Sequence, residues 1–284
     1  YARGLKTQET KLITLIVPDT MNPFFAAFTQ YVERTLYEHE YKLILCCANG
    51  IPEKEIGYLN LASQSKTDGI IALTYTDVSS AIPARIPIVS FDRYFEDHDV
   101  PMIASDNFQG GYTGTKKLME LGCHHPVFIR FRSKFPSEAD KRMEGYLSAC
   151  QELGIRPDYL DQIDAIKERE ILEDFIQDHT DSHGRLTFDG VFANTDRQAY
   201  MVMKILKERG IRIPEDVQIL GFDGIRKYGI DEGALFVSSM CQPVEALGRL
   251  CVETLLKKRQ GIVVPTLSLL PVTYCYGGTT RREP

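Results

Sequence analysis

Short apolar runs that stop at a turn or a polar residue alternate with amphipathic segments along nearly the whole chain. The run at 12–17, for example, is followed by Asn22, which can cap a helix, and by Pro23, which is favoured at a first helical position. Apolar residues then recur at helical spacing up to residue 36. Because short apolar runs of this kind are typical of buried strands, the alternation predicts an α/β fold built on parallel sheets.

The pattern runs through two successive series. The expected strands are 12–17, 41–47, 69–73, 86–91, 102–105, 127–131, 159–163, 190–193, 218–222, 236–240 and 266–276. The expected helices are 23–36, 53–65, 109–122, 139–153, 168–178, 196–209 and 244–258. Two series predict two doubly wound parallel-sheet lobes with a cleft between them. We expect the helix at 244–258 to return to the first lobe and the last strand to return to the second, which gives three crossovers.

The length of 284 residues suits two lobes better than one core. The expected division assigns 11–122 plus 241–262 to an N-terminal lobe and 123–240 plus 263–284 to a C-terminal lobe. The net charge of −6 argues against nucleic-acid binding by these residues themselves, since phosphate recognition needs a clustered excess of Lys and Arg. No apolar run suits a membrane span, and no signal peptide is visible. The seven cysteines show no repeated spacing, which is typical of reduced thiols in a cytoplasm.

Polar residues follow many of the expected strands. The clearest case is PEDVQILGFDG, in which an apolar run ends at Asp223 between two glycines. Ligands of open parallel sheets bind outside the carboxyl ends of strands, although each such residue taken alone is more typical of a helix cap. The residues in this position are Asp19, Asp92, Arg93, Asp106, Arg130, Arg132, Asn194, Thr195, Asp196 and Asp223. Gathered around one cleft, with Phe24 or Phe25 as an apolar wall, they have the chemistry of a sugar site.

Arg142, in the run KRMEGY, lies at the start of an expected helix, where its guanidinium can hold two hydroxyls or a carboxylate. An ordinary surface arginine is the alternative interpretation. Enzyme motifs are weak: GGYTGTKK at 110–117 lacks the spacing of a phosphate-binding loop, and no GxGxxG follows a strand. His179 and His183 lie four residues apart in an expected loop, and no GxSxG is present. The sequence therefore predicts no enzyme, no cofactor and no metal site.

The ordered motifs resemble, from end to end, the effector-binding region of the LacI/GalR family of bacterial transcription regulators. They include ITLIVPDTMNPFF, SDNFQGGYTGTKKLMELGCHH, KRMEGYLSACQELGI, FDGVFANTDRQAY and IPEDVQILGFDG. The resemblance implies the type I periplasmic-binding-protein fold, which agrees with the two-lobe prediction. It also implies a repressor in which a small-molecule effector binds in the cleft and controls operator binding.

The resemblance implies roles for individual residues. Asp106 looks like the aspartate that meets the effector from the first lobe. Arg142 is similar to the arginine of an RxxGY motif that holds effector oxygens, and Asp223 is similar to the aspartate of the GFD loop. Further contacts are implied at Asn194, Thr195 and Asp196 of the ANxD-like loop and at Phe24 and Phe25 of NPFF. Asp19 and Arg132 complete the candidate effector-binding residues.

Two departures from the family pattern stand out. The segment 129–141 reads IRFRSKFPSEADK, which is basic and aromatic where the family usually has a glycine-rich loop. If Arg130, Arg132 and Lys134 face the cleft, a sugar phosphate is expected to bind better than its parent sugar. If they face solvent, a neutral sugar is the better expectation. Gly277 stands where the family commonly has an arginine, which leaves the packing of the C-terminal segment open.

We therefore expect a ligand-controlled repressor that works as a homodimer in the cytoplasm. Residues 1–10 are expected to be the end of the hinge segment, and operator DNA is expected to bind through a headpiece absent from this chain. The expected effector is a small sugar, with a disaccharide such as sucrose preferred. The alternatives are an extracytoplasmic sugar-binding protein of a transporter, which has the same fold, and a sugar-processing enzyme. Arg142→Ala is expected to abolish effector binding and to leave the fold nearly intact.

Overall fold

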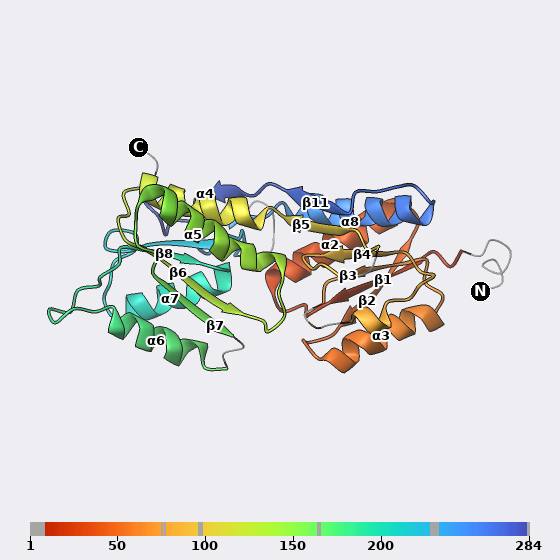
Figure 1. Cartoon of the computed structure of the whole chain (residues 1–284), viewed down its shortest axis with the longest axis horizontal. Helices are drawn as coiled ribbons and strands as arrows, with labels where there is room; N and C mark the ends of the chain where they lie inside the picture. The colour runs from red at the N-terminus through yellow and green to blue at the C-terminus, as the bar shows by residue number, and fades with distance from the viewer. Residues whose placement is uncertain are drawn as a thin grey trace. The chain divides into compact units, whose positions relative to one another are not determined.

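The computed structural model describes residues 9–74, 76, 78–95, 99–163, 166–227 and 233–282. These residues form two compact units, each with helices on both faces of a central sheet (Figure 1). Unit 1 contains the residues up to Ser105 together with Phe135–Glu138 and Pro243–Leu270. Unit 2 contains Asp106–Lys134, Ala139–Gln242 and the residues from Pro271 onward. The predicted α/β class and the two parallel-sheet lobes are confirmed.

The sheet of unit 1 is parallel throughout, with the strand order β11-β5-β4-β3-β1-β2. Its strands are β1 (Leu12–Val17), β2 (Lys42–Cys47), β3 (Gly69–Ala72), β4 (Ile88–Phe91), β5 (Met102–Ser105) and β11 (Leu267–Leu270). Helices α2 (Pro23–Glu38) and α8 (Val244–Arg259) cover one face and α3 (Pro52–Gln64) covers the other (Figure 1). Leu15 packs in the core under α2 and α8, and its neighbour Ile16 packs in the core under α3. A strand buried on both faces has to be apolar throughout, which explains the uninterrupted apolar runs of the sequence.

The sheet of unit 2 has the order β12-β10-β9-β8-β6-β7 and is parallel except for β12, which pairs antiparallel with β10. Its strands are β6 (Pro126–Arg132), β7 (Tyr159–Ile163), β8 (Gly190–Ala193), β9 (Gln218–Asp223), β10 (Ser238–Cys241) and β12 (Thr273–Cys275). One face carries α4 (Asn107–Glu120) and α5 (Lys141–Leu153), and the other carries α6 (Glu168–Asp178) and α7 (Asp196–Glu208) (Figure 1). Phe128 packs under the first pair of helices and Ile129 under the second.

The helices begin and end at the capping residues of the sequence. Asn22 Oδ1 accepts a hydrogen bond from the Phe24 N–H at 3.0 Å, and Pro23 is the first residue of α2. Helix α5 ends at Gly154, whose φ of 67° lies in the left-handed region that glycine adopts without strain. These predicted boundaries are confirmed.

The predicted strand at 266–276 is wrong as a single element. The structure divides it into β11 and β12, which belong to the sheets of different units. Pro271 lies between them and lacks the N–H that a strand needs for its ladder of hydrogen bonds. The last part of the chain therefore contributes one strand to each unit.

The two units also differ from the predicted division at residue 122. Helix α4, which the prediction placed in the N-terminal lobe, packs against α5 and belongs to unit 2. Glycines permit this contact, because a Cβ at Gly111 would lie 2.0 Å from the main-chain oxygen of Arg142. A Cβ at Gly145 would likewise lie 2.1 Å from the main-chain oxygen of Phe108. Helical periodicity locates such a helix but does not say which sheet it covers.

The C-terminal segment packs closely on unit 2. Thr279 Oγ1 donates to the main-chain oxygen of Ile219 at 2.7 Å, and Arg281 Nη1 donates to that of Gly122 at 2.8 Å. A Cβ at Gly277 would lie 2.2 Å from the main-chain oxygen of Val237, so no side chain fits there in this packing. The glycine at 277 is therefore compatible with a tightly held segment.

Candidate functional site

Arg142, in the first turn of α5, is the centre of a buried polar cluster in unit 2. Only 4% of its surface is exposed. Its Nε donates to Asn107 Oδ1 at 2.7 Å, and its Nη1 donates to the main-chain oxygen of Asn194 at 2.5 Å. Its guanidinium carbon lies 3.7 Å from the centroid of the Phe222 ring, and Nη1 lies 3.8 Å from Asp223 Oδ1. The starts of α4 and α5 and the ends of β8 and β9 therefore meet at one arginine.

Asp223 is the last residue of β9 and has a φ of 128°, which is unusual for a residue with a side chain. Gln242, directly after β10, holds it in place. The Gln242 Nε2 donates to Asp223 Oδ1 at 2.8 Å, and the Gln242 N–H donates to the main-chain oxygen of Asp223 at 3.2 Å. Burial raises the pKa of Asp223, and the positive charge of Arg142 opposes that rise.

Asn194 brings an acceptor without a partner to this region. Its side chain is buried, and among the described residues no donor reaches its Oδ1. Its backbone is fixed, because its N–H donates to the main-chain oxygen of Ile129 at 2.8 Å and its carbonyl accepts from Arg142. A buried acceptor left unpaired costs about 1–3 kcal/mol, so most such atoms have a partner. The Oδ1 of Asn194 therefore lacks the donor that a buried acceptor normally has.

Thr195 and Asp196 hold the loop after β8 through local bonds. Thr195 caps α7 by accepting from the Gln198 N–H at 3.3 Å. Asp196 is buried and accepts from Ser239 Oγ at 2.6 Å and from the Ile225 N–H at 2.6 Å. Burial and then the nearby carboxyl group of Asp223 raise the pKa of Asp196. Asp196 thus connects the loop after β8 to the loop after β9 and to strand β10.

The other candidates have structural surroundings. Asp106 caps α4 by accepting from a backbone N–H of its first turn at 2.9 Å. Asp19, in unit 1, accepts from two N–H groups of the turn before α2 at 2.8 and 2.7 Å. Phe24 and Phe25 are each 7% exposed and belong to the core of unit 1, where the ring centroids of Phe24 and Phe91 lie 6.1 Å apart. The structure therefore brings Arg142, Asn194 and Asp223 together and gives these four residues capping or core contacts.

The basic stretch after β6 is paired with carboxylates of unit 2. Arg130 donates to both oxygens of Asp161 at 2.8 Å and to Asp140 Oδ1 at 3.0 Å. Arg132 Nε donates to the same Asp161 at 2.9 Å. The two arginines hold the pKa of Asp161 below its usual range. Arg130 and Arg132, which were expected to attract an anionic effector, therefore already have acidic partners.

Sequence reasoning missed three residues of the cluster. Asn107, Phe222 and Gln242 all contact Arg142 or Asp223 directly. Gln242 follows a strand, so the rule that selected Asp223 would have found it as well. Phe222 is an inward-facing strand residue that the sequence cannot distinguish from other core phenylalanines.

Other site types have less support. Among the residues that the structure describes, no three His, Cys, Asp or Glu side chains come together as metal ligands do. His179 instead bonds the main-chain oxygen of Phe175 at 2.8 Å and Asp158 Oδ2 at 3.0 Å. No described helix is both long enough and apolar enough to cross a membrane.

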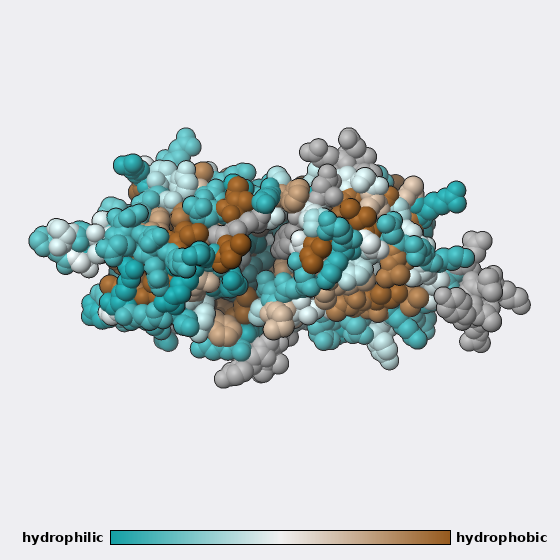
Figure 2. Space-filling model, turned by 90° about the horizontal axis from the view of Figure 1, so that it is seen from below, coloured by the Kyte–Doolittle hydropathy of each residue, from teal (hydrophilic) through white to brown (hydrophobic). Residues whose placement is uncertain are grey.

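Most of the surface in Figure 2 is hydrophilic, with hydrophobic patches between the polar residues. In unit 1, Leu45 on the edge strand β2, Ile51 before α3 and Leu61 on α3 are exposed by 42%, 39% and 43%. Single exposed apolar side chains of this kind are ordinary on a protein surface.

Comparison with known proteins places the chain in a family. Residues 10–262 match the family described as periplasmic binding proteins and sugar binding domain of the LacI family. The sucrose operon repressor of Streptococcus mutans is 29% identical over 272 residues, which cover 95% of this chain and 82% of that protein. The ribose operon repressor of Halalkalibacterium halodurans is 32% identical over 262 residues, which cover 90% of this chain and 75% of that protein.

A solved structure shows the same relation. The periplasmic binding protein/LacI transcriptional regulator from Alkaliphilus metalliredigens, complexed with D-xylulofuranose, is 28% identical. The match has a TM-score of 0.81 and covers 96% of this chain and 100% of that one. The chain therefore belongs to the LacI family, in the part that family members share with periplasmic binding proteins.

Proposed function

We propose that this chain is the effector-sensing domain of a LacI-type transcriptional repressor and that a small sugar binds at the Arg142 cluster of unit 2. The observation that carries the proposal is the buried, unpaired Oδ1 of Asn194 beside a fixed arginine. The relatives named as sucrose and ribose repressors favour this function over a transport protein or a sugar-processing enzyme.

The chemistry of the cluster suits a neutral polyol. Arg142 supplies donors in a rigid plane, and Asp223 and Asn194 supply acceptors, which together match hydroxyl groups that both donate and accept. The charges of Arg142 and Asp223 oppose each other at 3.8 Å, so the cluster has no large excess of either sign. Because Arg130 and Arg132 are paired with Asp161, a neutral sugar is a better effector than a sugar phosphate. We keep a disaccharide such as sucrose as the preferred effector, with ribose as the main alternative.

Binding of the sugar is proposed to change the affinity for operator DNA, which is coupling between two distinct sites. We propose that a DNA-binding headpiece precedes these residues and that residues 1–10 connect it to the effector-sensing domain. We further propose that the protein works as a homodimer in the cytoplasm.

Asn194→Ala tests the proposal because it removes an unpaired acceptor and leaves the backbone bonds in place. Sucrose, ribose, xylulose and glucose are titrated by calorimetry and by thermal denaturation, since a ligand of the folded state raises the midpoint. We expect one of these sugars to bind the unchanged chain. Its affinity should fall about tenfold in Asn194→Ala, or ~1.4 kcal/mol.

Asn60→Ala, at an exposed position of α3, is the matched control and should leave the affinity unchanged. If all four sugars fail to bind, or if Asn194→Ala binds the sugar as tightly as the control, the proposed site is wrong.

A further inference from the structure

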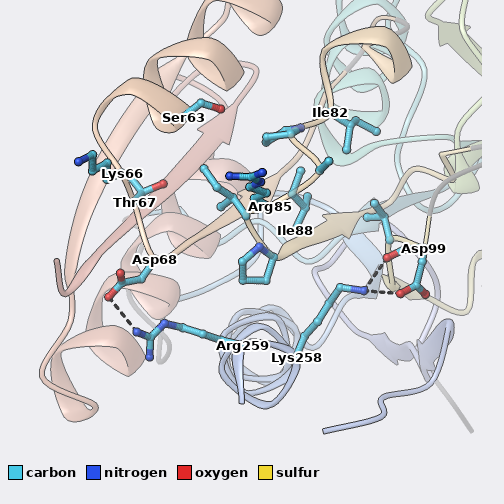
Figure 3. A pocket seen from close by; sticks show the side chains of 15 residues that line it. Ser63, Lys66, Thr67, Asp68, Ile82, Arg85, Ile88, Asp99, Lys258 and Arg259 are labelled. Carbon is cyan, nitrogen blue, oxygen red and sulfur yellow. Dashed lines mark hydrogen bonds and ion pairs between the residues drawn. The ribbon is translucent and has the colours of Figure 1, made fainter. Parts of the chain in front are cut away.

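A pocket of about 730 Å³ lies in unit 1 at the amino-terminal edge of its sheet. It is bounded by the end of α3, the segment 82–88 that leads into β4, the residues before β5 and the last turn of α8 (Figure 3). Asp19, the effector candidate in unit 1, follows the carboxyl end of β1, at the opposite edge of the same sheet. The pocket is therefore separate from the proposed sugar site.

The lining of the pocket has an excess of positive charge. Its charged residues are Lys66, Arg85, Lys258 and Arg259 against Asp68 and Asp99. The whole chain carries a net charge of −6, so this excess is local. Figure 3 shows these side chains around the pocket, in the turn after α3, in the loops that lead into β4 and β5, and on the last turn of α8.

Within the described ranges, two of the four cations are paired with carboxylates and the other two are not. Lys258 Nζ lies 2.8 Å from Asp99 Oδ2, and Arg259 Nη2 lies 3.6 Å from Asp68 Oδ2. Neither Lys66 nor Arg85 has an acidic partner among the described residues. Helix α8 ends here, and Lys258 and Arg259 also offset the negative end of its dipole. A ligand is therefore expected to rely mainly on Lys66 and Arg85.

We propose that this pocket binds a small organic phosphate. An unpaired guanidinium and an unpaired ammonium suit a dianionic group, and ligand pockets of about 300–1,000 Å³ are usual for small molecules. Ile82, Ile86 and Val100 provide an apolar wall for the organic part of the ligand. The pocket volume and the charge excess together favour an organic phosphate over a simple inorganic anion.

Two residues that line the pocket, Asp68 and Arg259, also anchor residues 9–11, which lead into β1. Asp68 accepts from the Thr10 N–H at 3.1 Å and from the Lys11 N–H at 2.9 Å. Arg259 Nη2 lies 3.0 Å from Glu9 Oε1. A phosphate held mainly by Lys66 and Arg85 lies in the same pocket as Arg259, competes there with Glu9 and Asp68 for this side chain, and so loosens the anchoring of residues 9–11. If the chain is a repressor domain, as proposed above, this site acts on the segment that leads to the headpiece.

The experiment uses phenyl phosphate, which has the required dianion and ring and is not a sugar. Binding is measured by calorimetry at constant ionic strength, with inorganic phosphate and phenol as partial ligands. We expect phenyl phosphate to bind more tightly than either. The double variant Lys66→Ala/Arg85→Ala should bind it at least tenfold more weakly, and higher salt should weaken binding to the unchanged chain.

Lys54→Ala/Arg156→Ala is the matched control, since it removes the same two charges from exposed positions outside the pocket. Equal loss in both double variants, or no binding to the unchanged chain, would overturn the proposal. Sugar binding should be the same in Lys66→Ala/Arg85→Ala as in the control. The phosphate site and the proposed sugar site can therefore fail independently.

Hydrogen exchange tests the second part of the proposal. The amides of Thr10 and Lys11 should exchange faster when phenyl phosphate is bound, because Asp68 and Glu9 then lose their contacts with Arg259. Unchanged exchange at saturating phenyl phosphate would leave a binding site without influence on this segment and would refute the coupling.

Discussion

Arg142 combines two functions that are difficult to separate by mutation. It is nearly fully buried, and its bonds connect the start of α4 to the loop after β8. Its charge also offsets that of the buried Asp223. The same contacts that orient its guanidinium for a ligand therefore stabilise unit 2.

We expect Arg142→Ala to lower the free energy of unfolding by about 3–5 kcal/mol, because it leaves Asp223 buried without its cation. The earlier expectation of a nearly intact fold is revised for this reason. Urea denaturation of Arg142→Ala, Arg142→Lys and the exposed control Arg156→Ala measures the effect. Lysine should recover part of the loss, and a stability of Arg142→Ala equal to that of the control would contradict this role.

Asp196 should make the stability depend on pH. Burial and Asp223 raise its pKa in the folded state, whereas in the unfolded chain its pKa is ordinary, near 3.8. The folded state then binds more protons than the unfolded state above about pH 4, so the contribution of this group to stability falls as the pH rises. Lost hydrogen bonds in Asp196→Asn add an offset that does not depend on pH.

The stability of the unchanged chain minus that of Asp196→Asn should therefore decrease between pH 4 and pH 8. Denaturation curves at several pH values measure this difference. A difference that increases over the same range would show that Asp196 is charged and stabilised in the folded protein.

At the scale of elements, the antiparallel pair β10 and β12 brings two thiols together. The register opposes Cys241 to Thr273 and Ser239 to Cys275, so the cysteines are diagonal neighbours on one face. Hydrogen bonding from the Cys241 thiol lowers the pKa of Cys275 to about 6. Burial in an apolar environment instead raises the pKa of Cys251.

Cys275 should therefore be the most reactive of the described thiols at pH 7, because the thiolate is the nucleophile. Iodoacetamide labelling followed by peptide mass spectrometry gives the rate at each cysteine. Cys241→Ala removes the donor and should slow the labelling of Cys275, whereas Cys150→Ala, in the α5 core, should not. Labelling of Cys251 before Cys275 would contradict the assignment.

Much of the fold could be predicted from the sequence, because each buried strand is a separate apolar run and each helix has recognisable caps. The error at 266–276 arose because an apolar run does not indicate which sheet it joins, and Pro271 was the one local signal of a break. At the site, Arg142, Asn194 and Asp223 were identified and do lie together in unit 2. Thr195 and Asp106 were selected by the same rule but cap helices, since the same side chains serve both purposes. Only tertiary contacts distinguish the two.

At the scale of the whole molecule, we expect the exposed apolar side chains of unit 1, Leu45 on the edge strand β2 and Leu61 on α3, to take part in self-association. Leu45→Lys/Leu61→Lys adds charges at these positions without changing the core, since the two residues are 42% and 43% exposed. Sedimentation at micromolar concentration should show a dimer for the unchanged chain and a monomer for this variant. Leu153→Lys, on an apolar residue of unit 2 that is 38% exposed, should remain dimeric. A dimer that persists in the double variant would place the contact elsewhere.

The late position of β11 and β12 has a consequence for protein synthesis. Both sheets have already received their other strands when β11 and β12 follow, and α8, which completes one face of unit 1, precedes them by only a few residues. On the ribosome, neither unit can therefore close before β11 and β12 have been translated. Until then, β5 and β10 present unpaired edges that are prone to aggregation. A nascent chain of this protein should depend on chaperones until β12 has emerged, whereas residues 1–142 released alone should not fold.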